Sequence, residues 1–401
     1  MKWSRKAANG NDSGWRSTCK NWPKSTARFS PLKQRRSRPL SLRSELGEVK
    51  LVVDYGQNPH SGRWSCPLRE AWGIGNHQKI TPGFAEKLCF TVTATGSYEE
   101  AAQVASKWAQ AMDDSTLHAL VQRAGTRAED LAQQRYQQVP QERVPQRAPS
   151  ELGVLLVDGC LMRYRGPGWG KMKTKKERVQ WHELKLGVYY RHEQLAQSET
   201  GRGLLSDKTV VAWQDQSAEL GRRLNWEGLR EGLGRAQQLL YLGDGAEWVW
   251  NLKKDRWNRA LELLDFYHSS EHLWNLGRAL HGERQPALSN WVEPLLHRVR
   301  HGKEKQALQR ISQLSRPAGE RGKAVRREQN YFKTHACRMN YEQIARQGWP
   351  IGSGAVESAC RQKQCRFKRC GQFWTKQGLR NLCALEEARR NRHWDQLWSL
   401  N

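Results

Sequence analysis

The chain has 401 residues and a formal net charge of +27, from 67 Lys and Arg residues against 40 Asp and Glu residues. So large an excess favours a polyanionic partner, of which nucleic acid is the commonest, over an inert basic surface. No apolar run reaches the roughly 20 residues that a membrane-spanning helix needs. The first residues lack the apolar stretch of a secretory signal, and the nine cysteines contain no C-x-x-C pair. We therefore expect a cytoplasmic protein with free thiols and no membrane partner.

The N-terminal part predicts a basic arm followed by a helical domain. Residues 1–45 hold many Lys and Arg and no apolar period, which predicts a disordered arm. Within a domain at 46–138, Ser97 lies three residues before Glu100, the spacing of a capping box. Residues 97–126 match two helices with a polar break, as in a helix-turn-helix, although helical hairpins without DNA are also common. The second helix would offer five polar side chains to a DNA groove: Ser115, Thr116, His118, Gln122 and Arg123.

A second domain is predicted after residue 150. The segment 139–150 holds three prolines and is interpreted as a linker. The elements that follow predict an α/β core of mixed strand direction, with strands at 153–159, 181–192, 207–214 and 237–249 and a helix at 217–233. We place the first part of this core at 151–268, an all-helical insertion at 269–346, and the completion of the core with basic helices at 347–401.

Two of the apolar strands end in Asp-Gly, at Asp158 and Asp244. Carboxylates at strand ends stand at the edge of a sheet, where functional groups collect. Asp-Gly also marks ordinary turns, but its presence after two strands apolar enough to be central favours a shared site. Two close aspartates bind hard divalent cations, usually Mg²⁺. Two such ions can activate an attacking oxygen and stabilise the leaving oxygen of a phosphodiester.

The segment GWPIGSGAVESACRQKQCRFKRCGQFW, residues 348–374, supplies a candidate for a third acid. Its glycine-rich turn predicts a helix that starts near Ser353 or Gly354 and carries Glu357 in about its first turn. The helix dipole alone would also explain an acid there. The cations that follow are suited to phosphate contacts: Arg361, Lys363, Arg366, Lys368 and Arg369. We therefore predict that Glu357 joins the two aspartates at a metal site beside a nucleic-acid surface.

With these residues in place, the sequence resembles the ISKra-type insertion-sequence transposases of bacteria. The blocks that carry the resemblance keep their order over roughly residues 45–400: LLVDGC, WHELKLG, YLGDGAEWVWNL, LDFYHSSEHLW and the segment 348–374. The resemblance implies a DDE-type transposase with an RNase H-like core, and Mg²⁺ or Mn²⁺, as two ions, held by Asp158, Asp244 and Glu357. Asp265 and His268 resemble a D-x-x-H element of some such enzymes, and we expect them to support the site without binding the metal.

The implied reaction is hydrolysis of a phosphodiester at an element end, followed by attack of the freed 3′-hydroxyl on target DNA. The implied partners are the terminal inverted repeats and target DNA, bound by a homodimer or larger assembly because two ends must be held together. Two alternatives stay open: a non-catalytic, element-derived DNA-binding protein or repressor, and an RNase H-like structure-specific nuclease. Glu183 and Glu247 are rival acids for the same site.

Overall fold

The computed structural model describes residues 32–399, apart from 73, 76–77, 110, 171–177, 200–202 and 284–285. The chain divides into two compact units between Ala85 and Glu86. The boundary expected at 139–150 is not observed, because these residues belong to the larger unit, where Val144 is buried with Tyr136 and Trp226. Within the described ranges, no helix is long and apolar enough to cross a membrane.

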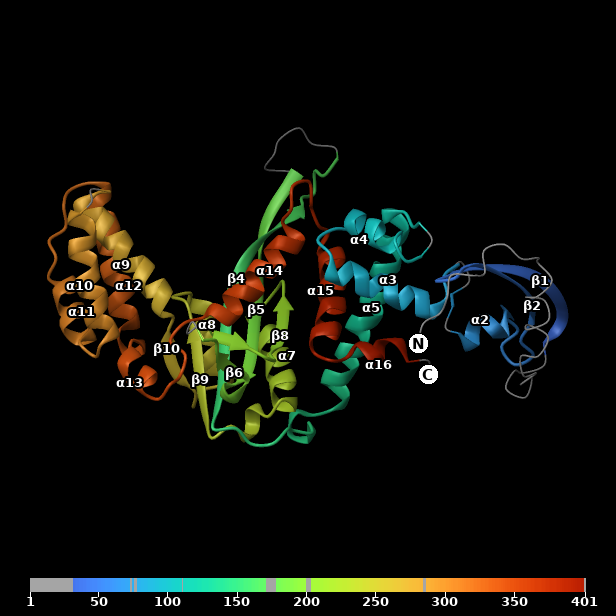
Figure 1. Cartoon of the computed structure of the whole chain (residues 1–401), viewed down its shortest axis with the longest axis horizontal. Helices are drawn as coiled ribbons and strands as arrows, with labels where there is room; N and C mark the ends of the chain where they lie inside the picture. The colour runs from blue at the N-terminus through green and yellow to red at the C-terminus, as the bar shows by residue number, and fades with distance from the viewer. Residues whose placement is uncertain are drawn as a thin grey trace. The chain divides into compact units, whose positions relative to one another are not determined.

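The smaller unit is built on an antiparallel hairpin (Figure 1). It contains β1 (Lys33–Ser44), β2 (Gly47–Gln57), β3 (Trp64–Ser65) and α2 (Pro67–Ala71), and α3 (Pro82–Ala94) begins in it. Strand β1 contradicts the disordered arm that was expected up to residue 45, whereas residues 1–31 of that arm lie outside the described residues. Burial of apolar side chains stabilises this strand, since Leu40 and Leu42 share one of its faces and are buried with Ile74.

The larger unit takes in the end of α3 and continues with two helices that are separated at residues 106–113, earlier than the break expected at 113–116. In α4 (Tyr98–Ala105), the Ser97 hydroxyl accepts the backbone N–H of Glu100 at 3.0 Å, as the capping box predicts. The next helix, α5 (Asp114–Gln138), runs for 25 residues and packs along α15 (Lys376–Arg390). A Cβ at Gly125 would lie 2.3 Å from the carbonyl oxygen of Asn381, so the two helices meet with backbone contact. One side of α5 is therefore occupied by protein.

A mixed five-stranded sheet forms the centre of the larger unit, in the order β10-β9-β4-β5-β8. The strands are β4 (Leu152–Arg165), β5 (Val179–Arg191), β8 (Thr209–Trp213), β9 (Gln238–Gly243) and β10 (Leu261–Leu264). Strands β4, β5 and β8 pair antiparallel, and β9 and β10 join them in parallel. The mixed α/β architecture expected from the strand order is thus confirmed. A separate pair is formed by β6 (Leu195–Gln197) and β7 (Gly203–Leu205).

Helices cover both faces of this sheet. On one face, α7 (Ser217–Arg230) brings Leu224 against Gly187 of β5, and α8 (Glu247–Arg256) lies beside it. The opposite face carries α14 (Gly354–Phe367), which packs on β4 and β5 (Figure 1). Between β10 and α14, the chain forms α9 (Phe266–His281), α10 (Ala287–Arg300), α11 (Glu304–Ser312), α12 (Glu320–His335) and α13 (Tyr341–Arg346). The last helix is α16 (Trp394–Trp398), and short 3₁₀ turns lie at Gln141–Arg143, His192–Gln194, Leu233–Arg235 and Ala336–Arg338.

Side chains of α15 and of Asn391, the residue that caps its C-terminus, complete the hydrogen bonding of the edge strand β8. The Asn391 amide accepts the N–H of Val210 at 3.1 Å and donates to its carbonyl at 2.9 Å. Glu387 accepts the N–H of Ala212 at 3.2 Å, and Arg380 donates to the Ala212 carbonyl at 2.8 Å. An exposed strand edge is a template for pairing with another chain. Here the side chains of one helix take the place of a sixth strand.

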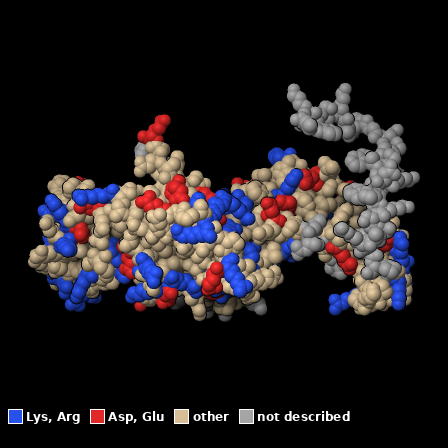
Figure 2. Space-filling view, turned by 90° about the horizontal axis from the view of Figure 1, so that it is seen from below, with Lys and Arg blue, Asp and Glu red and all other residues tan. Residues whose placement is uncertain are grey.

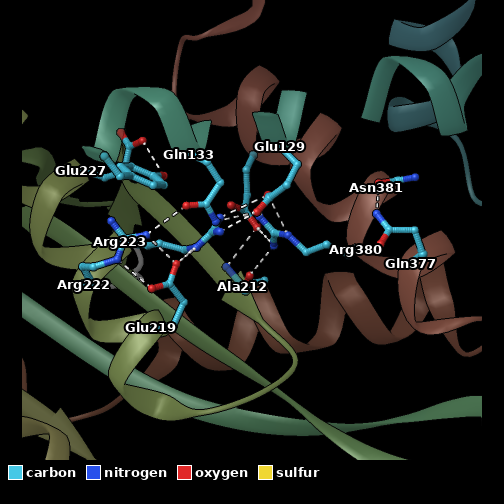
Figure 3. Close-up of polar contacts among 12 residues, drawn as sticks. Glu129, Gln133, Ala212, Glu219, Arg222, Arg223, Glu227, Gln377, Arg380 and Asn381 are labelled. Carbon is cyan, nitrogen blue, oxygen red and sulfur yellow. Dashed lines mark hydrogen bonds and ion pairs between the residues drawn. The ribbon is translucent and has the colours of Figure 1, made fainter. Parts of the chain in front are cut away.

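A buried charge network joins α5, α7 and α15 beside this edge (Figure 3). Glu129 accepts hydrogen bonds from Arg223 at 2.5 Å and from Arg380 at 2.8 Å, and both guanidinium groups lie over the ring of Trp213. Burial alone would raise the pKa of Glu129, but Arg380 and Arg223 outweigh it and bring this pKa to about 2. The network fixes α5 on the rest of the unit.

We expect Asn391→Ala to lower the free energy of unfolding by about 2–6 kcal/mol. The substitution leaves the buried N–H and carbonyl of Val210 without partners, and each unpaired group costs roughly 1–3 kcal/mol. Urea unfolding followed by circular dichroism measures the loss. Asn290→Ala, at an exposed position of α10, is the control and should change stability by only a few tenths of a kcal/mol. Equal effects of the two substitutions would contradict the role of Asn391.

Glu129→Gln should destabilise the protein at pH 7 by about 3–5 kcal/mol, because two buried guanidinium groups lose their shared carboxylate. The pKa of Glu129 is about 2 in the folded protein and 4.5 for the free side chain. Its stabilisation is therefore present above pH 4.5 and is lost as the pH falls toward 2. Melting temperatures measured from pH 7 to pH 3 should converge for the native protein and the variant. A difference that stays constant over this range would refute the assignment.

Candidate functional site

Three aspartates stand in one row where the parallel part of the sheet ends, although β4 itself continues beyond Asp158 to Arg165. The parallel pairing aligns Val157 of β4 with Gly243 of β9, and Gly243 with Leu264 of β10. The next residue after each of these is an aspartate: Asp158, Asp244 and Asp265. Neighbouring strands lie about 4.8 Å apart. The three residues therefore share one edge of the sheet, and Asp244 follows the middle strand.

Helix α14 lies across this row and is attached at both ends of it. The backbone N–H of Ser353 donates to Asp265 at 2.5 Å, and the thiol of Cys360 hydrogen-bonds to Asp158. Seven residues of helix rise about 10.5 Å, close to the roughly 10 Å between the two outer strands of the row. Glu357 is four residues after Ser353 and three before Cys360, so it lies on the side of α14 that faces the row.

The charged groups of the row affect one another's protonation. Burial and the negative charge of Asp244 both raise the pKa of Asp158. His268, in the first turn of α9, has its Nδ1 3.7 Å from the Asp265 carboxylate. The Asp265 carboxylate raises the pKa of His268 to about 9, and the charges of Asp244 and Asp158 act in the same direction. The imidazole is therefore protonated at neutral pH and balances part of the negative charge.

A tight group of potential metal ligands is formed by Asp265, His268 and Glu357, whose ligand atoms lie within 4.8 Å of one another. The other two aspartates of the row are outside this group. Asp265 is fully buried and caps α9 by accepting the His268 N–H at 2.9 Å, and the Ser353 hydroxyl donates to Glu357. Burial favours the neutral form of Asp265, but hydrogen bonds from His268 and Ser353 lower its pKa overall. Asp265 thus connects the starts of α9 and α14.

The helical segment α9–α13 packs onto the backbone of the row. Gly245 follows Asp244, and a Cβ at this position would lie 2.2 Å from the ring of Tyr331 in α12. The Tyr331 ring is itself stacked on His272 of α9, with 3.5 Å between the ring centroids. The turn after β9 is therefore held in place by two helices, and only glycine leaves room for this contact.

The two rival acids lie apart from the side of the sheet that Asp158 occupies. Successive residues of a strand point to opposite faces. Glu183 pairs with Leu161, and its carboxylate lies over Gly159, so it is on the face opposite Asp158. It forms an ion pair with Lys185 at 2.8 Å. Glu247 is exposed in the first turn of α8.

Two of the predicted DNA contacts on α14 are wrong. Lys363 is 2% exposed and forms an ion pair with Glu386 at 2.6 Å, and Arg366 is 6% exposed and donates to the Gly96 carbonyl at 3.0 Å. Both side chains are therefore buried in contacts between α14 and neighbouring segments. Arg361 and Arg369 are exposed, and Lys368 is partly buried. Arg369 forms an ion pair with Glu100 at 3.1 Å.

The side chains of α5 that were predicted to contact DNA differ in whether they already hydrogen-bond within the protein. The hydroxyls of Ser115 and Thr116 donate to Asp113, which caps the helix. Gln122 accepts a hydrogen bond from Asn381 of α15 at 2.9 Å, because it faces the packed side of α5. The two remaining residues, His118 and Arg123, are exposed. This helix therefore offers fewer free polar groups than its sequence predicted.

The sequence analysis missed a group of cations and aromatic rings on the outer half of the β4–β5 hairpin. Each cation lies over a ring at 5.0–5.3 Å from the centroid: Arg163 over Phe373, Arg165 over Trp169, and Lys368 over Trp181. Trp181 is 50% exposed. A signal was present in the alternation of basic and aromatic residues after Asp158, but the partners in 368–374 are distant in the chain. On the face seen in Figure 2, Lys and Arg are spread among Asp and Glu, so net charge alone does not locate a DNA surface.

Comparisons with known proteins do not identify a family for this chain. No family model matches the chain, and no curated protein matches it. Among solved structures, a similarity is found to a Drosophila P element transposase strand transfer complex, with 10% sequence identity and a TM-score of 0.37. It covers 77% of this chain and 92% of that chain.

We expect Asp265→Asn to lower the pKa of His268 from about 9 toward its ordinary value of 6.5, because the carboxylate is the main cause of the increase. Titration of the imidazole Cε1–H signal by NMR, without divalent metal, measures this change. Asp395→Asn, which removes an exposed acid in α16, should leave the His268 titration unaltered. A His268 pKa near 9 in Asp265→Asn would show that the ion pair is wrongly assigned.

Proposed function

We propose that the protein is a DDE-type DNA transposase of the ISKra type of insertion sequence, with an RNase H-like core. It would cleave phosphodiesters at element ends and join the freed 3′ ends to target DNA. The observation that carries the proposal is the row of aspartates where the parallel strands end, with α14 lying across it. This arrangement draws acids from residues 158, 244 and 357 toward one edge of a mixed sheet. The net charge of +27 supports a polyanionic substrate.

The residues present fit Mg²⁺ or Mn²⁺. These ions prefer oxygen ligands, and Asp158, Asp244 and Glu357 would supply carboxylates. Charge favours the fit, because burial and then repulsion from Asp244 raise the pKa of Asp158, and a divalent cation would relieve that repulsion. When bound, two ions would lower the pKa of an attacking water and stabilise the leaving oxygen of the phosphodiester.

The chain's own residues would orient this site. The register of β4 and β9 fixes the two aspartates side by side, and the Ser353 hydroxyl holds one oxygen of Glu357 through its hydrogen bond. The protonated imidazole of His268 offsets part of the negative charge, which eases the approach of a phosphate. Asp265 has a supporting role in this proposal, because its carboxylate already accepts backbone N–H groups at the starts of α9 and α14.

The cations in and just after α14 would bind the DNA near the site. Arg361 is exposed one turn beyond Glu357, and the partly buried Lys368 and the exposed Arg369 follow the end of the helix at Phe367. His118 and Arg123 of α5 are further candidates for contacts with the terminal repeats. Because two element ends must be held together, we propose a homodimer or larger assembly on DNA.

The test incubates purified protein with labelled element-end DNA, target DNA and Mg²⁺. Native protein should cleave the end and join it to the target. Asp158→Asn should reduce cleavage by about 100-fold or more, the loss typical when a group that stabilises transition-state charge is removed. Glu183→Gln is the matched control, because Glu183 lies on the same hairpin but on the opposite face of the sheet. Its activity should stay near that of the native protein.

The products also separate the alternative functions. Cleavage without joined product would indicate an RNase H-like nuclease, and specific binding without cleavage would indicate a DNA-binding protein such as a repressor. Equal cleavage by the native protein and Asp158→Asn would remove Asp158 from the reaction and overturn the proposed site.

A further inference from the structure

One face of the β1–β2 hairpin in the smaller unit is apolar and buried near the turn and basic and exposed farther from it. Near the turn, Leu40 and Leu42 of β1 point to this face and are buried. Alternate residues of a strand share a face, so Arg38 and Arg36 continue the same row away from the turn. In the pairing with β2, Arg36 lies opposite Tyr55. Both arginines are exposed, so the apolar row becomes a basic one.

The two guanidinium groups are placed over aromatic rings. Arg38 lies 4.4 Å from the ring centroid of Tyr55, and Arg36 lies 5.8 Å from that of Trp64 in β3. The two rings stack on each other, with centroids 5.5 Å apart and an interplanar angle of 22°. Stacking through the flat face holds a guanidinium in place while its N–H edges stay free to donate to oxygen acceptors.

Charge around these residues points to an anionic partner. Strand β1 carries five cations and no acid: Lys33, Arg35, Arg36, Arg38 and Arg43. The Asp54 carboxylate binds Arg35 at 2.6 Å, and Asp54 lies opposite Ser37, on the other face of the hairpin. Among the described residues, no ion pair with a carboxylate is found for Arg36 or Arg38. Their donors therefore remain available to a ligand.

We propose that Arg36, Arg38, Tyr55 and Trp64 form a strip that binds the phosphate backbone of DNA. Forked guanidinium donors suit phosphate oxygens, and backbone contacts of this kind are independent of base sequence. The choice of DNA among polyanions rests on the proposed function. The strip itself belongs to the smaller compact unit, whereas the row of aspartates belongs to the larger one. It also differs from the helix pair at 97–126 that the sequence predicted.

The experiment measures binding of the full chain, carrying Asp244→Asn, to a 30-base-pair duplex of arbitrary sequence by fluorescence anisotropy in EDTA. The slope of log K against log salt falls by about 0.9 for each phosphate contact that is lost. Arg36→Gln with Arg38→Gln should therefore reduce the magnitude of the slope by about 1.8, and Arg38→Gln alone by about half of that. The matched control is Arg35→Gln, which removes the same charge from the same strand and should leave the slope almost unchanged because Asp54 already neutralises Arg35.

An unchanged slope in the double variant, or equal slope changes for Arg35→Gln and Arg38→Gln, would overturn the proposed binding strip.

Modification of the unsubstituted arginines by phenylglyoxal, read by mass spectrometry, gives an answer even where a variant does not fold. Bound DNA should protect Arg36 and Arg38 more than Arg35, and equal modification with and without DNA would refute the proposal. Stronger binding to duplex RNA than to duplex DNA would overturn the choice of partner. Because no cleavage is measured, failure here is distinguishable from failure of the aspartate row.

Discussion

The parallel register of β4, β9 and β10 is the constraint on which the rest of the site depends. Val157, Gly243 and Leu264 align across three strands, and the aspartate after each one reaches the same edge of the sheet. A shift of one residue in β9 would turn its apolar side chains to the wrong face and move Asp244 out of the row. The strand cores are almost wholly apolar and buried, so the hydrophobic effect that forms the sheet also sets the position of the acids.

The C-terminal helices contact both the row of aspartates and β8, the edge strand on the far side of β5. Helix α14 contacts the row through Ser353 and Cys360, while α15 supplies the side chains that complete β8. The loop between these two helices brings Trp374 beside Tyr164, where it pairs with the outer part of β4. Segments that follow the helical region α9–α13 thus stabilise strands that precede it.

How much the sequence predicted depends on whether the signal was local. The end of β9 before Asp244 was predictable, because an apolar run followed by Asp-Gly can mark where a buried strand stops. The end expected at Asp158 was wrong, because β4 continues to Arg165 in its pairing with β5. The start of α14 was predictable from the glycine-rich turn before Glu357. The burial of Lys363 was not, because helical spacing gives the face of a residue but not the partner that covers it. The partners of Val210 and Ala212 lie 168–181 residues away, in α15 and at its C-terminal cap, where the sequence shows no sign of that role.

The central claim is that the row of aspartates and α14 form one site for divalent cations. Anomalous diffraction from crystals soaked in Mn²⁺ tests it most directly. The account predicts a peak at the edge of the sheet, between Asp158 and Asp244 and within reach of Glu357, which disappears in crystals of Asp244→Asn. No peak at this edge in well-ordered crystals of the native protein, or a peak bound only by residues elsewhere, would contradict the account.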